Sequence, residues 1–272
     1  MGTGADKIPA GQPGEYSPHL PEAIPRAEGR RQLGITGALP FAGEDIWNAY
    51  ELSWLDAGGK PMVATGEFRI PANSPNIIES KSLKLYLNSL NGARYESLET
   101  VRSTVAADLE GVCGAEAQVW LHKAASAGAP AQGEPVGHCI DTEVLEVPAY
   151  DLDPELLHDS VDSRSPVSET LHSNLLKTNC PVTGQPDWAT VMIRYRGPRI
   201  RRRALLAYLI SFRNHAEFHE QCVERMFMDI ERFCRPSALS VYARYLRRGG
   251  LDINPFRSNF ETPPPNVRLL RQ

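Results

Sequence analysis

The sequence predicts an α+β protein of two consecutive units, each an antiparallel sheet with a pair of consecutive helices on one face. Three observations lead to this prediction. Alternating apolar and polar residues flank a turn at 56–59, two adjacent segments with helical spacing follow, and the second half repeats this order. Because the helices are consecutive within each half, they suit one face of an antiparallel sheet rather than the crossovers of a parallel one.

The first half carries the elements of one such unit in order. An Asp-Ala-Gly-Gly stretch between two alternating segments predicts a hairpin. Leucines, and then valines, at helical spacing predict two consecutive helices. The expected elements are a hairpin over 50–70, helices over about 80–90 and 98–109, a strand at 117–121, a loop rich in Ala, Gly and Pro at 124–135, and a strand near 142–147.

The second half begins with an alternating, β-branched segment that predicts a strand, and two helical segments follow it. The longer helix places Cys222, Met226, Ile230 and Phe233 on one apolar face, and Pro236 ends it. The expected elements are a strand at 188–195, helices over about 203–212 and 218–234, a strand at 239–246, a Gly-Gly turn at 249–250, and a last strand to about 254.

Composition suggests where the units begin and end. Residues 1–40 are rich in Pro, Gly and charge without periodicity, which predicts an extended arm around the body or a partly disordered segment. The segment 151–166 is acidic and contains two prolines, which makes it the natural linker. We therefore expect one module over 41–150 and a second over 151–272.

The overall composition narrows the class of protein. A net charge of -4 gives no general attraction to nucleic acid or anionic membranes, so contact with neither is expected. No apolar run reaches the ~18 residues of a membrane span, and the N-terminal residues lack the apolar core of a secretory signal. Five scattered cysteines argue against a disulfide framework and for a reducing cytoplasm. No Cys/His cluster has the spacing of a metal site.

One candidate nucleophile stands out among the cysteines. Cys180 lies in a segment rich in Pro, Gly and Thr between two ordered regions, so its thiol is expected on a loop. Asp187 follows seven residues later and offers an acid that can donate a proton to whatever the thiol attacks. The alternative is an inert small residue in a turn. Cys222 and Cys234 fit the apolar face of a helix and are expected to pack in the core.

Three polar segments are candidates for ligand contacts. His219 and Glu220 begin the long helix, where a carboxylate can accept from the N–H donors of a guanine-like ring; a solvated helix junction is the alternative. A helix opens at Glu79 with Ser80, Lys81 and Lys84 beside free backbone N–H groups, which suits either phosphate or simple capping. The basic Gly-Gly turn at 247–250 allows a phosphate contact or a solvated hairpin.

Four segments in this order resemble the NADPH-dependent 7-cyano-7-deazaguanine reductases of tRNA queuosine biosynthesis, in their long two-module form. They are ESKSLKLY at 79–86, the loop from Cys180 to Asp187, FHEQCVER at 218–225 and RRGGLDINP at 247–255. The likeness runs from about residue 39 to 272, and no matched position departs from the pattern. It implies tandem modules of the tunnelling fold, whose relatives bind purine- or pterin-like rings and close barrels by assembling subunits, hence at least a homodimer.

The resemblance also implies a reaction. A thiolate attacks the nitrile of the deazapurine substrate to form a thioimide, and two NADPH reduce it to the amine without a metal. The residues carried over are Cys180 as nucleophile, Asp187 as proton donor and His219 for later proton steps; Ile78, Glu79, Ser80, His219 and Glu220 as contacts of the deazaguanine ring; and Ser80, Lys81, Arg248 and Gly249 as contacts of NADPH.

Two other functions stay open at this point. A hydrolase of the GTP cyclohydrolase type shares the fold, but it requires a zinc set, and no partner pair for Cys180 lies at ligand spacing. A non-catalytic module that binds a purine-like ligand would not need Cys180. A metal assay identifies the first, and a Cys180→Ala variant with unchanged affinity identifies the second.

Overall fold

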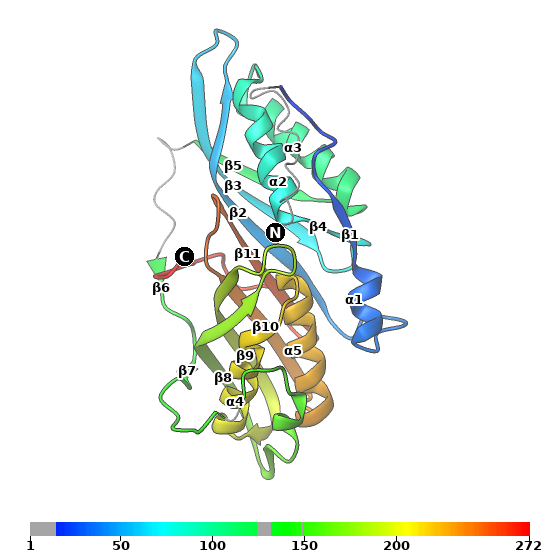
Figure 1. Cartoon of the computed structure of the whole chain (residues 1–272), viewed down its shortest axis with the longest axis vertical. Coiled ribbons are helices and arrows are strands. Elements are labelled where there is room, and N and C mark those ends of the chain that lie inside the picture. Colours follow the sequence, from blue (N-terminus) through cyan, green and yellow to red (C-terminus); the bar gives the residue numbers. More distant parts are fainter. Residues whose placement is uncertain (1–14, 124–131, 148) are drawn as a thin grey trace, which may run out of the picture.

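The computed structural model describes residues 15–123, 132–147 and 149–272 and has an α+β architecture (Figure 1). One sheet of eight strands has the order β5-β3-β2-β11-β10-β9-β8-β7, and all its pairs are antiparallel except β7 with β8. Its strands are β2 (Ala42–Leu55), β3 (Pro61–Pro71), β5 (Gln118–Lys123), β7 (His138–Cys139), β8 (Val161–Asn179), β9 (Pro186–Ile200), β10 (Ala238–Tyr245) and β11 (Leu251–Ser258).

Two short strand pairs and the helices complete the described chain. The α-helices are α1 (Arg26–Gln32), α2 (Ser80–Ser89), α3 (Leu98–Cys113), α4 (Arg202–Ser211) and α5 (His219–Cys234). The 3-10 turns are η1 (Leu90–Gly92), η2 (Pro154–Leu157) and η3 (Phe212–Asn214). The small pairs are β1 (Ala23–Pro25) with β4 (Asn76–Ile78), and β6 (Gln132–Gly133) with β12 (Arg268–Leu269). No helix in these described ranges is long and apolar enough to span a membrane.

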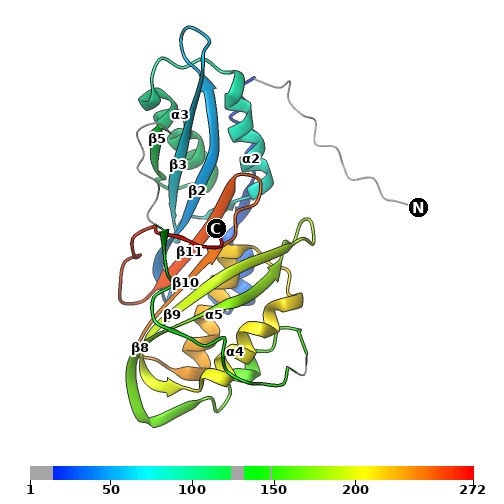
Figure 2. The same cartoon turned by 90° about the vertical axis from the view of Figure 1, so that its left-hand side faces the viewer.

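The two halves of the chain share the sheet. Strand β11 from the second half pairs with β2 from the first over 251–258 and 42–49, and Figure 2 shows the strands following one another in a single layer. The sheet therefore has no break at the predicted division near residue 150. The functional motifs of the two halves can meet at this seam.

Each half buries its own helix pair against the sheet, as the hydrophobic spacing predicts. Helices α2 and α3 pack on β2, β3 and β5 around one apolar core, and α4 and α5 pack on β8 to β11 around another (Figure 1). In α5, Cys222, Met226 and Ile230 are fully buried, whereas Phe233 is only partly buried. This arrangement confirms the α+β fold class and the consecutive helix pair of each half.

Two sequence predictions about the strands are wrong. The expected strand near 142–147 does not form, because the chain leaves the edge of β8 after Ile140 and turns with a hydrogen bond from the Glu143 N–H to the Ile140 carbonyl. The expected linker 151–166 overlaps β8, which begins at Val161. This first part of β8 is polar and mostly exposed, and an irregularity in the pairing with β9 accommodates Pro166, so the apolar alternation of a strand is absent.

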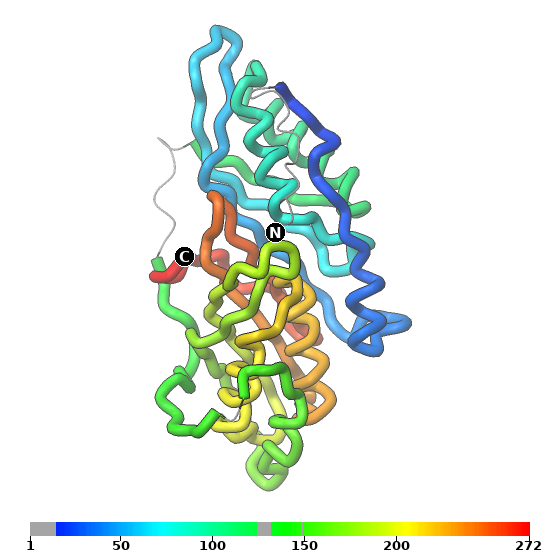
Figure 3. The backbone as a smooth tube through the Cα atoms, viewed as in Figure 1, coloured from blue at the N-terminus to red at the C-terminus, as the bar shows by residue number. Residues whose placement is uncertain are grey.

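The segment preceding the sheet is more ordered than its composition predicts. Helix α1 lies inside the expected extended or partly disordered arm, so that expectation is wrong for residues 26–32; residues 1–14 lie outside the described ranges. Figure 3 shows this segment running beside the helices of the first half and then reaching α5. Charge holds it there: Arg26 pairs with Asp45 of β2 at 2.5 Å, and Arg30 pairs with Glu224 of α5 at 2.7 Å. Sequence periodicity cannot reveal such buried ion pairs.

Replacing Arg30 by methionine tests whether this segment belongs to the folded body. Arg30 donates to both carboxylate oxygens of Glu224 and to the Ala72 carbonyl, so the change is expected to lower the free energy of unfolding by about 2 kcal/mol. Urea denaturation measures the loss. Arg31→Met is the matched control, because Arg31 is exposed on the same helix. Equal unfolding midpoints for the two variants would contradict the anchoring role of Arg30.

Candidate functional site

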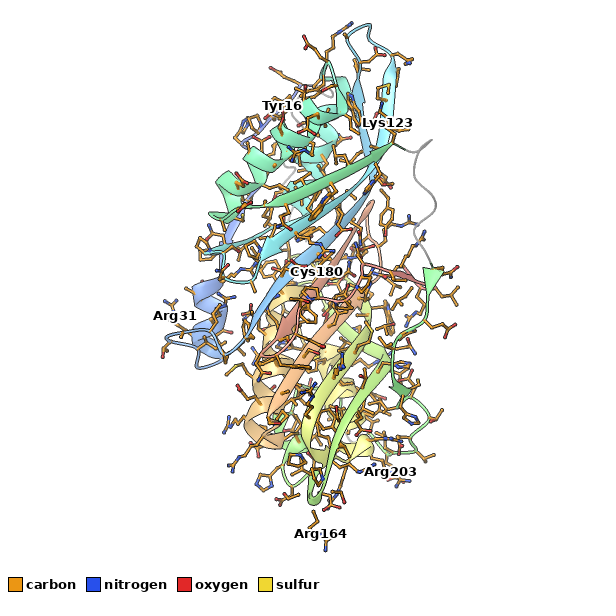
Figure 4. All side chains as sticks on the ribbon, turned by 180° about the vertical axis from the view of Figure 1, so that it is seen from behind. Tyr16, Arg31, Lys123, Arg164, Cys180 and Arg203 are labelled. Carbon is orange, nitrogen blue, oxygen red and sulfur yellow. The ribbon has the colours of Figure 1, made fainter. Side chains whose placement is uncertain are left out.

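Cys180 begins the turn that joins β8 to β9. Its N–H donates to the Gln185 carbonyl at 2.8 Å, and the Gly184 N–H donates back to the Cys180 carbonyl at 2.9 Å. Gly184 has a φ of 69°, a left-handed conformation that a residue without Cβ adopts at little cost. Figure 4 places Cys180 near the middle of the molecule, where the two halves meet. The thiol is therefore presented on a loop, as the sequence predicts.

The base of this turn is held against the segment that precedes α5. The Asn179 N–H donates to the His215 carbonyl at 2.8 Å, and the Glu217 N–H donates to the Asn179 carbonyl at 3.2 Å. The Lys177 ammonium reinforces the contact by donating to the Arg213 carbonyl at 2.7 Å. These bonds bring the Cys180 turn to the N-terminus of α5, although the two are far apart in the sequence.

The Cys180 thiol lies in surroundings that favour its ionised form. Burial raises the pKa of the thiol, but hydrogen bonds from the Thr183 hydroxyl and N–H, the Val182 N–H and the Arg248 guanidinium outweigh it, and the net pKa is lowered. A lower pKa increases the share of thiolate, which is the nucleophilic form. The source of thiol activation, which the sequence does not reveal, is thus the turn itself together with Arg248.

The other four cysteines have the opposite character. Burial raises the pKa of Cys113 and Cys139, raises that of Cys234 to about 11, and raises that of Cys222 well above its ordinary value. Cys222 and Cys234 are buried on α5, as predicted. Cys180 is therefore the one cysteine of the chain with a lowered thiol pKa.

Asp187 is buried between an arginine and a histidine side chain. Its Oδ1 lies 2.8 Å from an Arg248 nitrogen, and its Oδ2 lies 3.2 Å from Nε2 of His219. The His219 ring stacks on Tyr245 with centroids 3.7 Å apart and planes 10° from parallel. Nδ1 of His219 is buried without a hydrogen-bond partner in the described structure. The site thus holds the carboxyl of Asp187 next to the imidazole of His219, a group that can transfer protons, close to the Cys180 turn.

Glu220 is a buried carboxyl in the first turn of α5. Burial raises its pKa to about 8; the nearby charge of Asp45 adds to the rise, and Arg26 and Arg257 oppose it. The carboxyl is 3% exposed, and among the described residues its hydrogen bond comes from its own backbone N–H and not from a side chain. A buried acceptor of this kind is costly unless a ligand supplies N–H donors.

Glu79 and its neighbours open helix α2. The Glu79 carboxylate accepts from the backbone N–H groups of Lys81 at 2.9 Å and Ser82 at 2.6 Å, which is a capping arrangement. Ile78 is buried at the end of β4, Ser80 is half-buried and Lys81 is exposed. Glu79 therefore has the capping role that the sequence left open, and both of its carboxylate oxygens take part in it.

Lys84 connects this helix to the Gly-Gly turn of the other half. Gly249 has a φ of 56°, and a Cβ there would lie 3.1 Å from Cδ of Lys84. Burial lowers the pKa of Lys84 and Arg248 adds to the effect, while Glu79, Asp187 and Cys180 oppose it. The motifs of the two halves therefore converge on one region. A pocket of about 240 Å³ lies beside it, lined by Lys84, Gly249, Gly250 and residues of β2 and α2.

The structure brings together some of the predicted residues directly and others only as neighbours. Asp187 contacts both His219 and Arg248 beside Cys180, and Glu79 and Gly249 lie around Lys84. Direct contacts with this cluster are not found for Ile78, Ser80 or Lys81 in the described ranges. Sequence reasoning missed Thr183 and Tyr245. Thr183 shares the turn with Cys180, but no local signal distinguishes Tyr245 from any other strand residue.

The described residues contain no group of three or more His, Cys, Asp or Glu side chains arranged to hold a metal ion. The fold and the cluster instead define a class: an α+β enzyme of two helix-backed sheet modules, with an activated cysteine and a buried acid at the seam. Comparison with known proteins identifies the family within this class.

A family model described as "Nitrile reductase, 7-cyano-7-deazaguanine-reductase N-term" matches residues 12–121, and one described as "QueF-like protein" matches residues 186–264. Proteins named NADPH-dependent 7-cyano-7-deazaguanine reductase are similar along nearly the whole chain. One from Burkholderia ambifaria is 55% identical over 95% of this chain and 94% of its own. One from Hydrogenovibrio crunogenus is 54% identical over 94% and 92%. The chain belongs to the 7-cyano-7-deazaguanine reductase family, which confirms the resemblance inferred from its four motifs.

Proposed function

We propose that the protein is an NADPH-dependent oxidoreductase that reduces the nitrile of 7-cyano-7-deazaguanine to the aminomethyl group, in the queuosine pathway of the cytoplasm. The observation that carries the proposal is the activated Cys180 thiol beside the buried Asp187–His219 pair. It occurs in a chain that is 55% identical to a relative named for this reaction. A nitrile carbon is electrophilic, so a thiolate held next to an acid is suited to attack it.

The deazaguanine ring is proposed to bind between the N-termini of α2 and α5. Glu220 accepts from the adjacent N–H donors on the ring, which supplies the partners that its buried carboxyl lacks. Glu79 approaches the ring while it caps α2, and Ile78 and Ser80 line the site. His219 lies next to Glu220 on α5 and contacts both the deazaguanine ring and the carboxyl of Asp187. These assignments follow the family motif residue by residue.

The covalent step uses Cys180 and Asp187. The thiolate forms a C–S bond to the nitrile carbon, and an electron pair of the C≡N bond moves to nitrogen. The proton released by the thiol passes to the Asp187–His219 pair, and Asp187 delivers it to the nitrile nitrogen. The product is a thioimide, with no net gain or loss of protons.

Reduction then requires two hydrides. Bound NADPH would supply both hydrides, one to the thioimide carbon and, from a second NADPH molecule, one to the later imine. Between them the C–S bond breaks, Cys180 leaves as a thiolate, and the imine remains in the site. His219, stacked on Tyr245 and paired with Asp187, is placed to provide the protons that the nitrogen gains in these later steps.

The cofactor site is proposed to lie at the Lys84–Gly249 contact. Lys84 is half-buried and forms no ion pair among the described residues, and the pocket of about 240 Å³ opens beside it. Arg248 and Gly249 from one half, and Ser80 and Lys81 from the other, complete the contacts that the family motif implies. Ammonium, guanidinium and free backbone N–H groups fit the phosphates of NADPH.

The stoichiometry of NADPH consumption tests the proposed reaction. With limiting 7-cyano-7-deazaguanine and excess NADPH, we expect two equivalents of NADPH to be oxidised for each nitrile at the plateau. One equivalent would show that the imine escapes and that the second reduction is assigned wrongly. Binding of the nitrile without NADPH consumption would identify a non-catalytic binding module instead.

We also propose that the protein acts as at least a homodimer, because the resemblance implies barrels closed by assembling subunits. Light scattering is expected to give at least twice the chain mass of 30.1 kDa. A species of single-chain mass at working concentration would contradict this.

A further inference from the structure

Arg248 lies at the start of the turn between β10 and β11, and the backbone fixes its position. Its N–H donates to the Leu251 carbonyl at 2.9 Å, and the Leu251 N–H donates back at 3.3 Å. Gly249 and Gly250 both have positive φ values, 56° and 75°, which allow the turn to be this tight. The Arg248 side chain is consequently directed to the Cys180 turn from a neighbouring part of the sheet.

The Arg248 guanidinium contacts Gln185, which closes the Cys180 turn, and Asp187, two residues further along the chain. One nitrogen donates to Oε1 of Gln185 at 2.6 Å, and the other lies 2.8 Å from Oδ1 of Asp187. The Gln185 backbone carbonyl accepts the N–H of Cys180, so Arg248 holds the closing end of the turn in place. The same guanidinium helps to lower the pKa of the Cys180 thiol.

We propose that Arg248 is the positioning residue that prepares Cys180 for attack, and that it does so in the free protein before any cofactor is present. This role is additional to its expected contact with NADPH. Arg248 already has two partners within the protein, the Gln185 amide and the Asp187 carboxylate, and it helps to lower the pKa of the thiol. It therefore aligns the nucleophile with the proton donor and supplies the positive charge that offsets a thiolate. That Cys180 is the nucleophile rests on the proposed function, whereas the arrangement around its thiol does not.

Several charged groups surround the thiol, and their signs decide the direction of the effect. Asp187 on β9 and Glu79 at the start of α2 disfavour a thiolate. Arg248 on the β10–β11 turn and Lys84 on α2 favour it, while Lys177 on β8 and His219 on α5 lie near Asp187. Arg248 is the one charged residue among them that is a named cause of the lowered pKa of Cys180. Replacing Arg248 removes a positive charge near the thiol, and it also leaves Asp187 without its closest cation. Both effects shift the thiol pKa upward.

Alkylation of Cys180 by iodoacetamide across a pH series tests the proposal without nitrile or NADPH. Peptide mass spectrometry follows the rate at Cys180, and the half-exposed Cys139 is the internal reference. In the Arg248→Met variant, the midpoint of the rate profile is expected to rise by about one pH unit or more. Arg248→Lys, which keeps the charge without the planar fork, is expected to recover part of the shift. Gln185→Leu is expected to give a smaller rise, because it loosens one end of the guanidinium.

Arg247→Met is the matched control, since Arg247 is exposed on the same turn and stacks over Tyr50 instead. Its Cys180 midpoint is expected to equal that of the unmodified protein. Circular dichroism confirms that the variants are folded, and an unchanged Cys139 profile excludes a global effect. A Cys180 midpoint in Arg248→Met equal to that in Arg247→Met would overturn the proposal. A shifted midpoint in a protein that consumes no NADPH would uphold it and count against the proposed function alone.

Discussion

Replacement of Cys180 by alanine is expected to abolish nitrile reduction while the protein stays folded. The thiol is half-exposed, and the bonds that define its turn come from backbone groups that alanine retains. Little packing is therefore lost, and the unfolding midpoint is expected to change only slightly. Turnover depends on the C–S bond, and loss of a nucleophile reduces kcat by on the order of 10³-fold or more.

Two measurements separate this outcome from the alternatives. NADPH oxidation with excess nitrile gives the turnover, and intact-mass spectrometry without NADPH detects the thioimide on the unmodified protein and its absence from Cys180→Ala. Cys139→Ala is the matched control, because Cys139 is the other half-exposed cysteine. Retained turnover in Cys180→Ala would remove the nucleophile assignment, and unchanged ligand affinity with no adduct in either protein would favour a binding module.

The sequence is sufficient to predict the parts of the fold that rest on apolar periodicity. The helix pairs at 80–113 and 202–234 and the strands β9 and β10 are found close to the expected bounds, because buried faces impose helical or alternating spacing. Strand β8 and helix α1 were not predicted, because the first part of β8 is polar and ion pairs hold α1. The buried Arg257, which bridges Asp45 and Glu224, is likewise indistinguishable in sequence from a solvated arginine.

The candidate site likewise has residues that the sequence predicts and contacts that it does not predict. Cys180, Asp187 and His219 carry chemistry in their residue types and match family motifs, so the sequence alone was enough to propose them. The sequence does not show that Arg248 bonds to the carboxylate of Asp187, or that Tyr245 supports the ring of His219. These contacts join residues from separate strands and turns, and only the pairing of β8 with β9 and of β9 with β10 makes them adjacent.

Glu220→Gln is expected to weaken binding of the deazaguanine ring while it stabilises the free protein, and pH separates these effects. For stability, the folded-state pKa of about 8 lies above the ordinary value of 4.5, so the folded protein holds a proton that the unfolded chain releases. This contribution is fully present below pH 4.5 and is lost as the pH rises through 8. The stability advantage of Glu220→Gln should therefore grow from mildly acid pH to pH 8 and then level off, as urea denaturation at each pH would show.

Binding has the opposite dependence, because the ring's N–H donors prefer a carboxylate to a neutral acid. Below pH 8 the protein must release a proton when the ring binds, so the affinity of the unmodified protein should rise with pH up to that value. Glutamine keeps an acceptor oxygen but not the charge, so we expect roughly 10- to 100-fold weaker ring binding and unchanged NADPH binding.

Calorimetry in two buffers of different ionisation enthalpy measures the proton release directly, and the exposed Glu28→Gln is the control. Equal loss of affinity for the ring and for NADPH would place Glu220 outside the ring site. Binding without proton release at neutral pH would mean that the ring meets a carboxyl that keeps its proton. In that case Glu220 would donate a hydrogen bond to the ring and would not accept hydrogen bonds from its N–H groups.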